Sequence, residues 1–212
     1  MARPYAIFDF DGTLADSLQE SLLAYNRVAP RLHLRQVQAG EIAELRRMNA
    51  GQLLHALGIP MWKLPHLMIA ARADLHDHFH AVEPIPGIAS SLTSLVAAGY
   101  HLAIVTSNSE ENVRGFLVRH GIDGFETVLA GASVFGKGTR IKRLLRHARA
   151  ARTPSVYVGD MVTDIRAARE AGTAAIAVTW GFNDRAPLAA ERPDALTEAT
   201  DELAPAILRL LG

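Results

Sequence analysis

The chain has 212 residues, of which 49% are hydrophobic and 21% charged, so it is long enough to bury one sizeable core and a small second unit. Its 22 basic side chains balance 22 acidic ones, and no overall field favours nucleic acid or an anionic membrane as a partner. Cysteine is absent, which excludes disulfides, thiolate metal sites and cysteine nucleophiles.

A short apolar run, residues 5–9 (YAIFD), predicts the first strand. The run is too short for a signal peptide, and no other segment has the apolar length of a membrane span. We therefore expect a cytoplasmic protein without a membrane partner.

Residues 16–83 contain several helical patterns and no convincing strand. Pro30, Gly40, the segment 58–60 and Pro65 separate these patterns. Because such a stretch is too long for a simple loop between a strand and a helix, we predict a separate all-helical cap domain over 16–83. Residues 1–15 and 84–212 are then the catalytic core.

Beyond residue 83, apolar runs alternate with helical patterns. The runs are continuous rather than alternating, which indicates strands covered on both faces, as in a parallel sheet. Strands are expected at 101–106, 127–130, 155–159 and 174–179, and helices at 88–98, 110–120, 139–149 and 162–171. This order predicts an α/β fold, a Rossmann-like core with a parallel sheet flanked by helices.

The sequence DFDGT at 9–13 follows the first strand directly. Asp9 and Asp11 lie two residues apart, so their side chains can point the same way and address one site. Two carboxylates at the end of an apolar strand favour a cation between them, and Gly12 permits a sharp exit of the backbone. A solvated turn is the alternative explanation.

Two further segments supply groups that suit phosphate. Thr106, Ser107 and Asn108 end the second expected strand just before a helix, where hydroxyl, amide and backbone N–H groups can bind an anion. Lys137 lies between two glycines, and we prefer it to Lys142, which is too far along its helix. Taken alone, the first segment is explained by a helix N-cap and Lys137 by a solvated basic helix.

The sequence GDMVTD at 159–164 follows another expected strand. Asp160 and Asp164 are one helical turn apart, so both can face one metal ion. Mg²⁺ prefers such hard oxygen ligands.

These four segments, in this order, resemble the haloacid-dehalogenase-like (HAD) phosphatases, and among them the phosphoglycolate-phosphatase-like branch with a helical cap after the first motif. The resemblance implies hydrolysis of a small phosphorylated metabolite through an aspartyl-phosphate on Asp9, with Asp11 as acid and base and with Thr106 and Lys137 holding the transferring oxygens. It also implies Mg²⁺ bound by Asp9, Asp160 and the main-chain carbonyl of Asp11, with Asp164 as a further ligand or as a residue that orients a bound water. The further residues expected to bind the substrate are Gly12, Thr13, Ser107 and Asn108.

The cap holds other residues of interest. We consider Arg46 and Arg47 as ligands for a substrate carboxylate or a second phosphate, against simple solvent exposure. Histidines and acids gather at 74–80, where a second metal is less expected than an exposed helix end. Met61, Trp62 and Met68 are expected to pack inside the cap.

Two alternatives to the phosphatase stay open. One is a sugar phosphomutase of the same superfamily, similar to β-phosphoglucomutase, in which a substrate hydroxyl replaces water. The other is a catalytically silent binding protein that retains the fold. A monomer or a homodimer is expected, with no nucleic acid partner.

Overall fold

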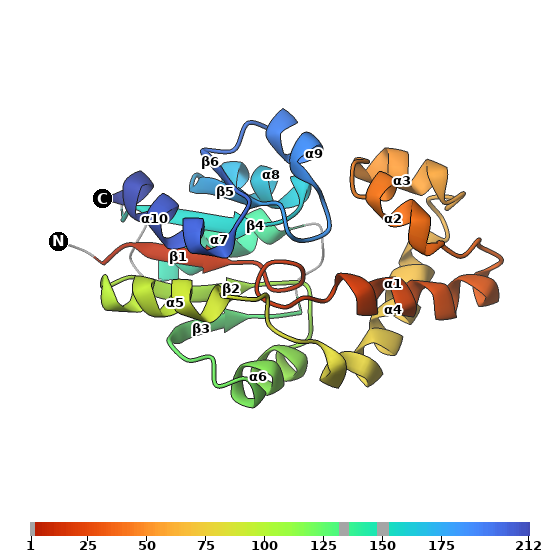
Figure 1. Cartoon of the computed structure of the whole chain (residues 1–212), viewed down its shortest axis with the longest axis horizontal. Helices are drawn as coiled ribbons and strands as arrows, with labels where there is room; N and C mark the ends of the chain where they lie inside the picture. The colour runs from red at the N-terminus through yellow and green to blue at the C-terminus, as the bar shows by residue number, and fades with distance from the viewer. Residues whose placement is uncertain (1–2, 132–135, 148–152) are drawn as a thin grey trace.

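A computed structural model describes residues 3–131, 136–147 and 153–212 (Figure 1). Within these ranges six parallel strands form one sheet in the order β3-β2-β1-β4-β5-β6. The strands are β1 (Tyr5–Phe8), β2 (His101–Val105), β3 (Phe125–Leu129), β4 (Ser155–Gly159), β5 (Ala174–Val178) and β6 (Ala195–Thr197). This is the order of a Rossmann-like fold, and it confirms the predicted fold class.

Helices cover both faces of the sheet. Successive side chains of a strand point to opposite faces, so in β1 Ala6 and Phe8 join one apolar cluster while Ile7 joins the other. The first cluster packs α5 (Ile88–Ala97), α6 (Glu110–Arg119) and α10 (Thr200–Leu211) against the sheet. The second packs α7 (Lys137–His147), α8 (Val162–Ala171) and α9 (Arg185–Ala190). Burial on both faces explains why the strand sequences are continuously apolar.

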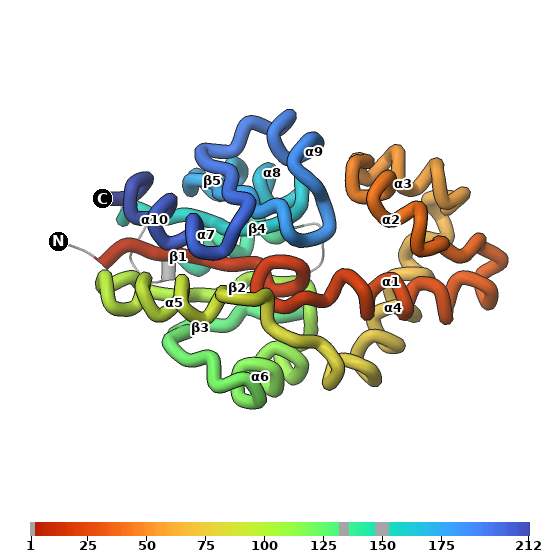
Figure 2. Tube along the Cα trace, in the orientation of Figure 1, coloured from red at the N-terminus to blue at the C-terminus, as the bar shows by residue number. Residues whose placement is uncertain are grey.

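Residues 16–83 form helices beside the core, at the right of Figures 1 and 2. The helices are α1 (Leu18–Val28), α2 (Ile42–Leu45), α3 (Ala50–Ala56) and α4 (Leu64–His78), with 3₁₀ turns at Ala29–Leu32, Ala39–Glu41 and Phe79–Ala81. They enclose an apolar cluster of their own, to which Val28, Leu57 and Leu67 belong. The helical content that we predicted is therefore present, while the domain boundaries at 15/16 and 83/84 stay a prediction.

The two connections between the core and the helical segment lie side by side. The amide of Asp16 donates to the carbonyl of Glu83 (2.8 Å), and the amide of Ile85 donates to that of Leu14 (2.9 Å). The segment thus leaves and returns at one point, next to the end of β1 (Figure 2).

Several expectations need correction. The strand β6 and helices α9 and α10 were not predicted, since a three-residue strand is too short to form a pattern. Helix α7 begins at Lys137 rather than 139, and residues 148–149 of the expected helix lie outside the described residues. Pro65 lies in the first turn of α4 and separates no helices.

The expected packing of Met61 and Trp62 inside the cap is wrong, because these side chains are 67% and 69% exposed. Among the described residues, no helix combines the length and the hydrophobicity that crossing a membrane requires.

Candidate active site

The carboxyl ends of β1 and β4 meet at the centre of the sheet, where the strand order reverses. Open parallel sheets bind their ligands at this switch point. Asp9 follows β1 and its amide donates to the carbonyl of Val158 in β4 (2.8 Å). Asp160 follows β4 directly, so the pairing of two strands brings these two aspartates together.

The turn after β1 is tight and depends on Gly12. The amide of Gly12 donates to the carbonyl of Ala15 (2.8 Å), and Gly12 has a φ of +71°, which L side chains rarely adopt. A Cβ at this position would overlap the carboxylate of Asp160 and lie 2.6 Å from the ring of Phe182. Gly12 therefore makes room for Asp160 at the junction of the two loops.

Three hydrogen bonds orient the carboxylates that follow β4. Asp160 accepts from the hydroxyl of Thr13 (3.0 Å) and from the amide of Phe182 (2.6 Å). Asp164, in the first turn of α8, accepts from the amide of Met161 (3.0 Å). Both aspartates are almost fully buried, so these bonds hold them in single positions.

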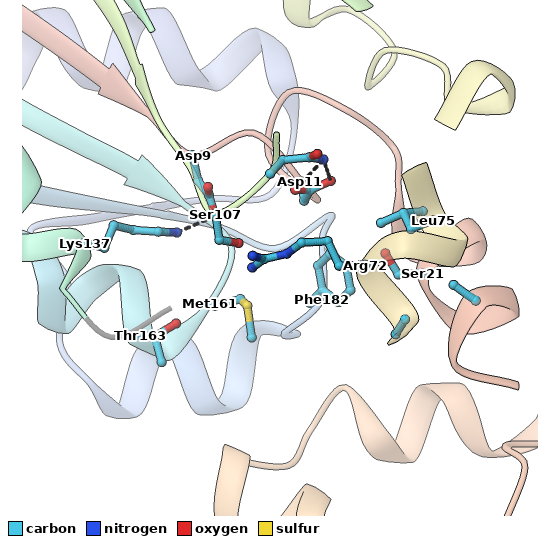
Figure 3. Close-up of a pocket in the computed structure, with 13 residues that line it drawn as sticks. Asp9, Asp11, Ser21, Arg72, Leu75, Ser107, Lys137, Met161, Thr163 and Phe182 are labelled. Atoms are coloured by element: carbon cyan, nitrogen blue, oxygen red, sulfur yellow. Dashed lines mark hydrogen bonds and ion pairs between the residues drawn. The ribbon is translucent and has the colours of Figure 1, made fainter. Parts of the chain in front are cut away.

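Lys137 connects two of the carboxylates at the sheet edge. Its Nζ donates to Asp9 (2.8 Å), as Figure 3 shows. It also donates to Asp164 (2.6 Å), and its side chain is buried. Helix α7 begins at this residue, so the lysine enters the site from the helix start. Lys142, the alternative in the sequence, is exposed.

The charges of Lys137 and of the three aspartates around it (Asp9, Asp160 and Asp164) do not balance. Burial raises the pKa of Asp9 to about 7, although Lys137 opposes the rise. Burial, followed by the charges of Asp164 and Asp9, raises the pKa of Asp160 well above its ordinary value. Burial lowers the pKa of Lys137, but Asp164 and Asp9 outweigh it and hold that pKa well above its ordinary value. One ammonium thus faces three buried carboxylates.

The excess negative charge fits a divalent cation. Asp9, Asp160 and Asp164 each offer an oxygen, and these oxygens all lie within 4.8 Å of one another. Carboxylate oxygens are the ligands that Mg²⁺ prefers. Three of the four predicted metal-binding residues are therefore brought together by their side chains, and the fourth, Asp11, was expected to contribute only its carbonyl.

Asp11 lies beside this cluster and is held by Asn108. The side-chain amide nitrogen of Asn108 (Nδ2) donates to both carboxylate oxygens of Asp11, at 3.0 Å each. Burial raises the pKa of Asp11 against the effect of these bonds. A raised pKa suits a carboxyl group that has to deliver a proton.

A cavity of about 230 Å³ lies between these residues and the helical segment (Figure 3). The residues that line it and that we predicted as site residues are Asp9, Asp11, Ser107, Asn108 and Lys137. The volume falls below the range of about 300–1,000 Å³ that is typical of sites for drug-sized ligands. The cavity therefore suits a small molecule.

Three of the residues that we predicted to contact the substrate do not line this cavity. Thr13 is fully buried and uses its hydroxyl for Asp160, and Gly12 makes room for that same carboxylate. In the structure both support Asp160, and their contact with the substrate stays a prediction. Thr106 is also fully buried, and its hydroxyl accepts a hydrogen bond from the backbone N–H of Asn108 (3.0 Å).

Arg72 of α4 lines the cavity and was not considered from the sequence. Its side chain extends toward Ser107 in Figure 3, and its charge lowers the pKa of Asp11, against the larger effect of burial. Within the described ranges it makes no hydrogen bond or ion pair. No motif marks this arginine, because only the packing of α4 brings it to the site.

The arginines that we did consider are engaged elsewhere. Arg46 donates to the carbonyl of Thr179 (2.7 Å), and Arg47 pairs with Asp184 (3.2 Å). Both join the helical segment to the loop after β5 and do not line the cavity.

Three of the polar residues at 74–80 have partners. Asp74 pairs with Arg27 (2.6 Å) and its carbonyl lies 2.7 Å from the ring of His78, while His76 lies 2.8 Å from Asn112 of α6.

A family model for haloacid dehalogenase-like hydrolases matches residues 6–178. The chain belongs to this family. Among its relatives, a phosphoglycolate phosphatase of Synechococcus elongatus is 35% identical over 206 residues, with 97% of each chain covered. One of Vibrio vulnificus is 30% identical over 215 residues, covering 95% of this chain and 94% of the relative.

Solved structures share the fold of this HAD-like chain. A predicted phosphatase from Clostridium acetobutylicum superposes with a TM-score of 0.79 at 19% identity, covering 99% of this chain and 100% of the other. A predicted phosphoglycolate phosphatase from Haemophilus somnus superposes with a TM-score of 0.74 at 23% identity, covering 95% and 96%. The resemblance stated from the motifs is confirmed, and the expected enzyme class, a phosphoric monoester hydrolase, agrees with the names of the relatives.

Proposed function

We propose that the protein is a Mg²⁺-dependent phosphatase that hydrolyses small phosphomonoesters similar to phosphoglycolate. The observation that carries the proposal is the buried cluster of Asp9, Lys137, Asp160 and Asp164, with Asp11 beside it at a small cavity. An unsatisfied negative charge at the carboxyl ends of β1 and β4 suits a metal and a phosphate group together.

The chemistry has two steps. An oxygen of Asp9 attacks phosphorus, the bond from phosphorus to the ester oxygen breaks, and Asp11 gives its proton to the departing oxygen. Water then attacks phosphorus of the aspartyl-phosphate, Asp11 takes a proton from that water, and the bond from phosphorus to Asp9 breaks. Inorganic phosphate leaves, Asp9 is a carboxylate again and Asp11 is protonated for the next cycle.

The remaining residues of the site would bind the phosphoryl oxygens and the metal ion. The Lys137 ammonium, buried against Asp9, is suited to offset the charge on the phosphoryl oxygens, and Thr106 is proposed to hold one of these oxygens. Asp9, Asp160, Asp164 and the Asp11 carbonyl would hold Mg²⁺, which supplies charge neutralisation for the phosphoryl group when bound.

The substrate class follows from cavity size and charge. A cavity of about 230 Å³ suits a small metabolite. Its wall includes the guanidinium group of Arg72, which has no ion-pair partner among the described residues. A guanidinium recognises carboxylates well. Phosphoglycolate carries a carboxylate close to its phosphate, and the relatives are named for this substrate.

The helical segment 16–83 is proposed to act as the cap that limits the size of the substrate. Its α1 and α4 contribute Ser21, Arg72 and Leu75 to the cavity wall. Cytoplasmic location and the oligomeric state, monomer or homodimer, stay predictions.

The test is phosphate release from a panel of esters, measured with Mg²⁺ and with chelator. The panel contains phosphoglycolate, p-nitrophenyl phosphate, sugar phosphates and nucleotides. We expect Mg²⁺-dependent release that is greatest for phosphoglycolate and is lost in Asp9→Asn. Turnover in Asp9→Asn at the wild-type rate would disprove the mechanism, and interconversion of sugar phosphates without release would identify a mutase.

The role of Arg72 is tested with Arg72→Gln, which should raise KM for phosphoglycolate about tenfold or more and leave that for p-nitrophenyl phosphate within about twofold. Arg47→Gln serves as the matched control, because Arg47 lies in the same helical segment but outside the cavity. An equal change for both substrates would contradict recognition of a carboxylate.

A further inference from the structure

Asp11 is connected to the helical segment by a continuous series of hydrogen bonds. Asn108 donates to Asp11 (3.0 Å), Asn112 donates to Asn108 (2.9 Å), and Nδ1 of His76 lies 2.8 Å from Oδ1 of Asn112. The first three residues belong to the core, whereas His76 belongs to α4. The series therefore crosses from the core to the helical segment.

The backbone N–H of Ser109 determines which atom donates in each hydrogen bond of this series. The amide of Ser109 can only donate, and it donates to Oδ1 of Asn108 (2.7 Å). The side-chain nitrogen of Asn108 must then face Asp11. Asn112 must present its own nitrogen to that same Oδ1, which leaves its oxygen to face His76. His76 consequently carries a proton on Nδ1 and is the terminal donor.

The core part of the series is built on a well-defined helix start. Ser109 is the N-cap of α6, and its hydroxyl accepts from the amide of Asn112 (3.1 Å). Asn108 is buried, with 5% of the residue exposed, so water does not easily replace its hydrogen-bond partners. Since all bonds point the same way, each one polarises the next and strengthens the last bond to Asp11.

We propose that His76 and Asn112 are positioning residues for Asp11, so that α4 completes the catalytic geometry only when it lies against α6. This inference rests on the proposed function, in which Asp11 moves the proton in both steps. Without the terminal donor, Asn112 is free to turn, Asn108 loses a partner, and the carboxyl group of Asp11 samples orientations that transfer no proton.

The variants are chosen to separate this role from a general effect on α4. His76→Ala removes the donor, and His76→Asn restores an amide N–H near the place of Nδ1. His78→Ala is the matched control, because His78 lies on the same helix and contacts Asp74 of that helix instead of α6. Asn112→Ala and the double variant with His76→Ala complete the set.

Kinetics give the first readout. In His76→Ala we expect kcat for phosphoglycolate to fall about fivefold without a rise in KM, in keeping with the loss of one hydrogen bond. His76→Asn should recover most of the rate, His78→Ala should match wild type, and the double variant should be no slower than Asn112→Ala. A rise in KM, no rescue by His76→Asn, or additive losses in the double variant would overturn the inference.

p-Nitrophenyl phosphate, which has a good leaving group, distinguishes a role of His76 in positioning Asp11 from a merely structural role of His76. p-Nitrophenolate departs without a proton, but hydrolysis of the aspartyl-phosphate still needs Asp11 as base. His76→Ala should therefore show a burst of p-nitrophenolate, equal to the enzyme concentration, that is larger than in wild type. A burst of wild-type size contradicts the inference.

A measurement independent of activity keeps the two proposals apart. The side-chain amide protons of Asn108 should shift in the NMR spectrum of His76→Ala, return toward wild type in His76→Asn and stay unchanged in His78→Ala. An unmoved signal in His76→Ala overturns the connection even in an inactive protein. A wild-type protein that releases no phosphate from any ester would instead count against the proposed function.

Discussion

Replacement of Asp9 by asparagine should stabilise the metal-free fold while it abolishes turnover. The side chain of Asp9 is 7% exposed and shares its site with Asp160 and Asp164, opposite the ammonium of Lys137. Asparagine has nearly the same shape but carries no charge. The variant therefore removes electrostatic repulsion and burial cost together with the nucleophile.

The magnitude follows from the pKa of Asp9, which rises from 3.8 to about 7 on folding. Each pKa unit corresponds to about 1.4 kcal/mol, so ionisation of this group costs the folded state about 4 kcal/mol above pH 7. Because the pKa of Asp9 is raised, the folded state holds this proton more tightly than the unfolded state. The contribution of Asp9 to the free energy of unfolding is therefore fully present below pH 3.8 and is lost as the pH rises through 7. Because the buried amide has its own desolvation cost, we expect a net gain of about 2 kcal/mol at pH 8.

Thermal unfolding in chelator measures this effect. For a chain of this size the gain corresponds to a melting temperature about 4–8 °C above wild type at pH 8, and the difference should vanish near pH 4. Asp123→Asn is the control, because Asp123 is exposed, and it should change nothing at either pH. Added Mg²⁺ should raise the melting temperature of wild type more than that of Asp9→Asn.

The reasoning is refuted if Asp9→Asn is no more stable than wild type at pH 8, or if its advantage does not depend on pH. Either result would mean that Lys137 alone balances the cluster. The case for a cation among the carboxylates would then lose its electrostatic argument.

Other variants probe separate parts of the molecule. Asp11→Asn should lower kcat about 10²–10⁴-fold in steady-state assays, and full activity would exclude Asp11 as acid and base. Gly12→Ala should cost about 1–3 kcal/mol in a denaturant titration, because the residue has a φ of +71° and a Cβ would overlap Asp160; an unchanged midpoint would show that the loop adapts. Phe116→Ala should cost about 3–5 kcal/mol by the same titration, since its fully buried ring meets that of Phe10 edge to face, and a loss below 1 kcal/mol would mean that the core collapses into the space.

The sequence alone predicted five of the six strands of the described sheet and the edge at which the candidate site lies. Continuous apolar runs such as residues 155–159 are visible locally, because a strand buried on both faces needs apolar side chains at every position. Carboxylates placed directly after two such runs lie at the same edge of the sheet, since parallel strands end there. The pairing of β1 with β4 then brings Asp9 next to Asp160 and Asp164, and their oxygens lie within 4.8 Å of one another.

Only the tertiary structure decided how the helical segment meets this edge. In the sequence Arg72 and His76 look like other polar residues of an amphipathic helix, and the arginines that we considered for the substrate were Arg46 and Arg47. The packing of α4 beside the sheet edge brings Arg72 to the cavity wall, while Arg46 and Arg47 hold the loop after β5. The bond from His76 to Asn112 joins residues 36 positions apart. Local periodicity depends on near neighbours in the chain, whereas such contacts depend on the angle and register between packed elements, for which the chain carries no local pattern.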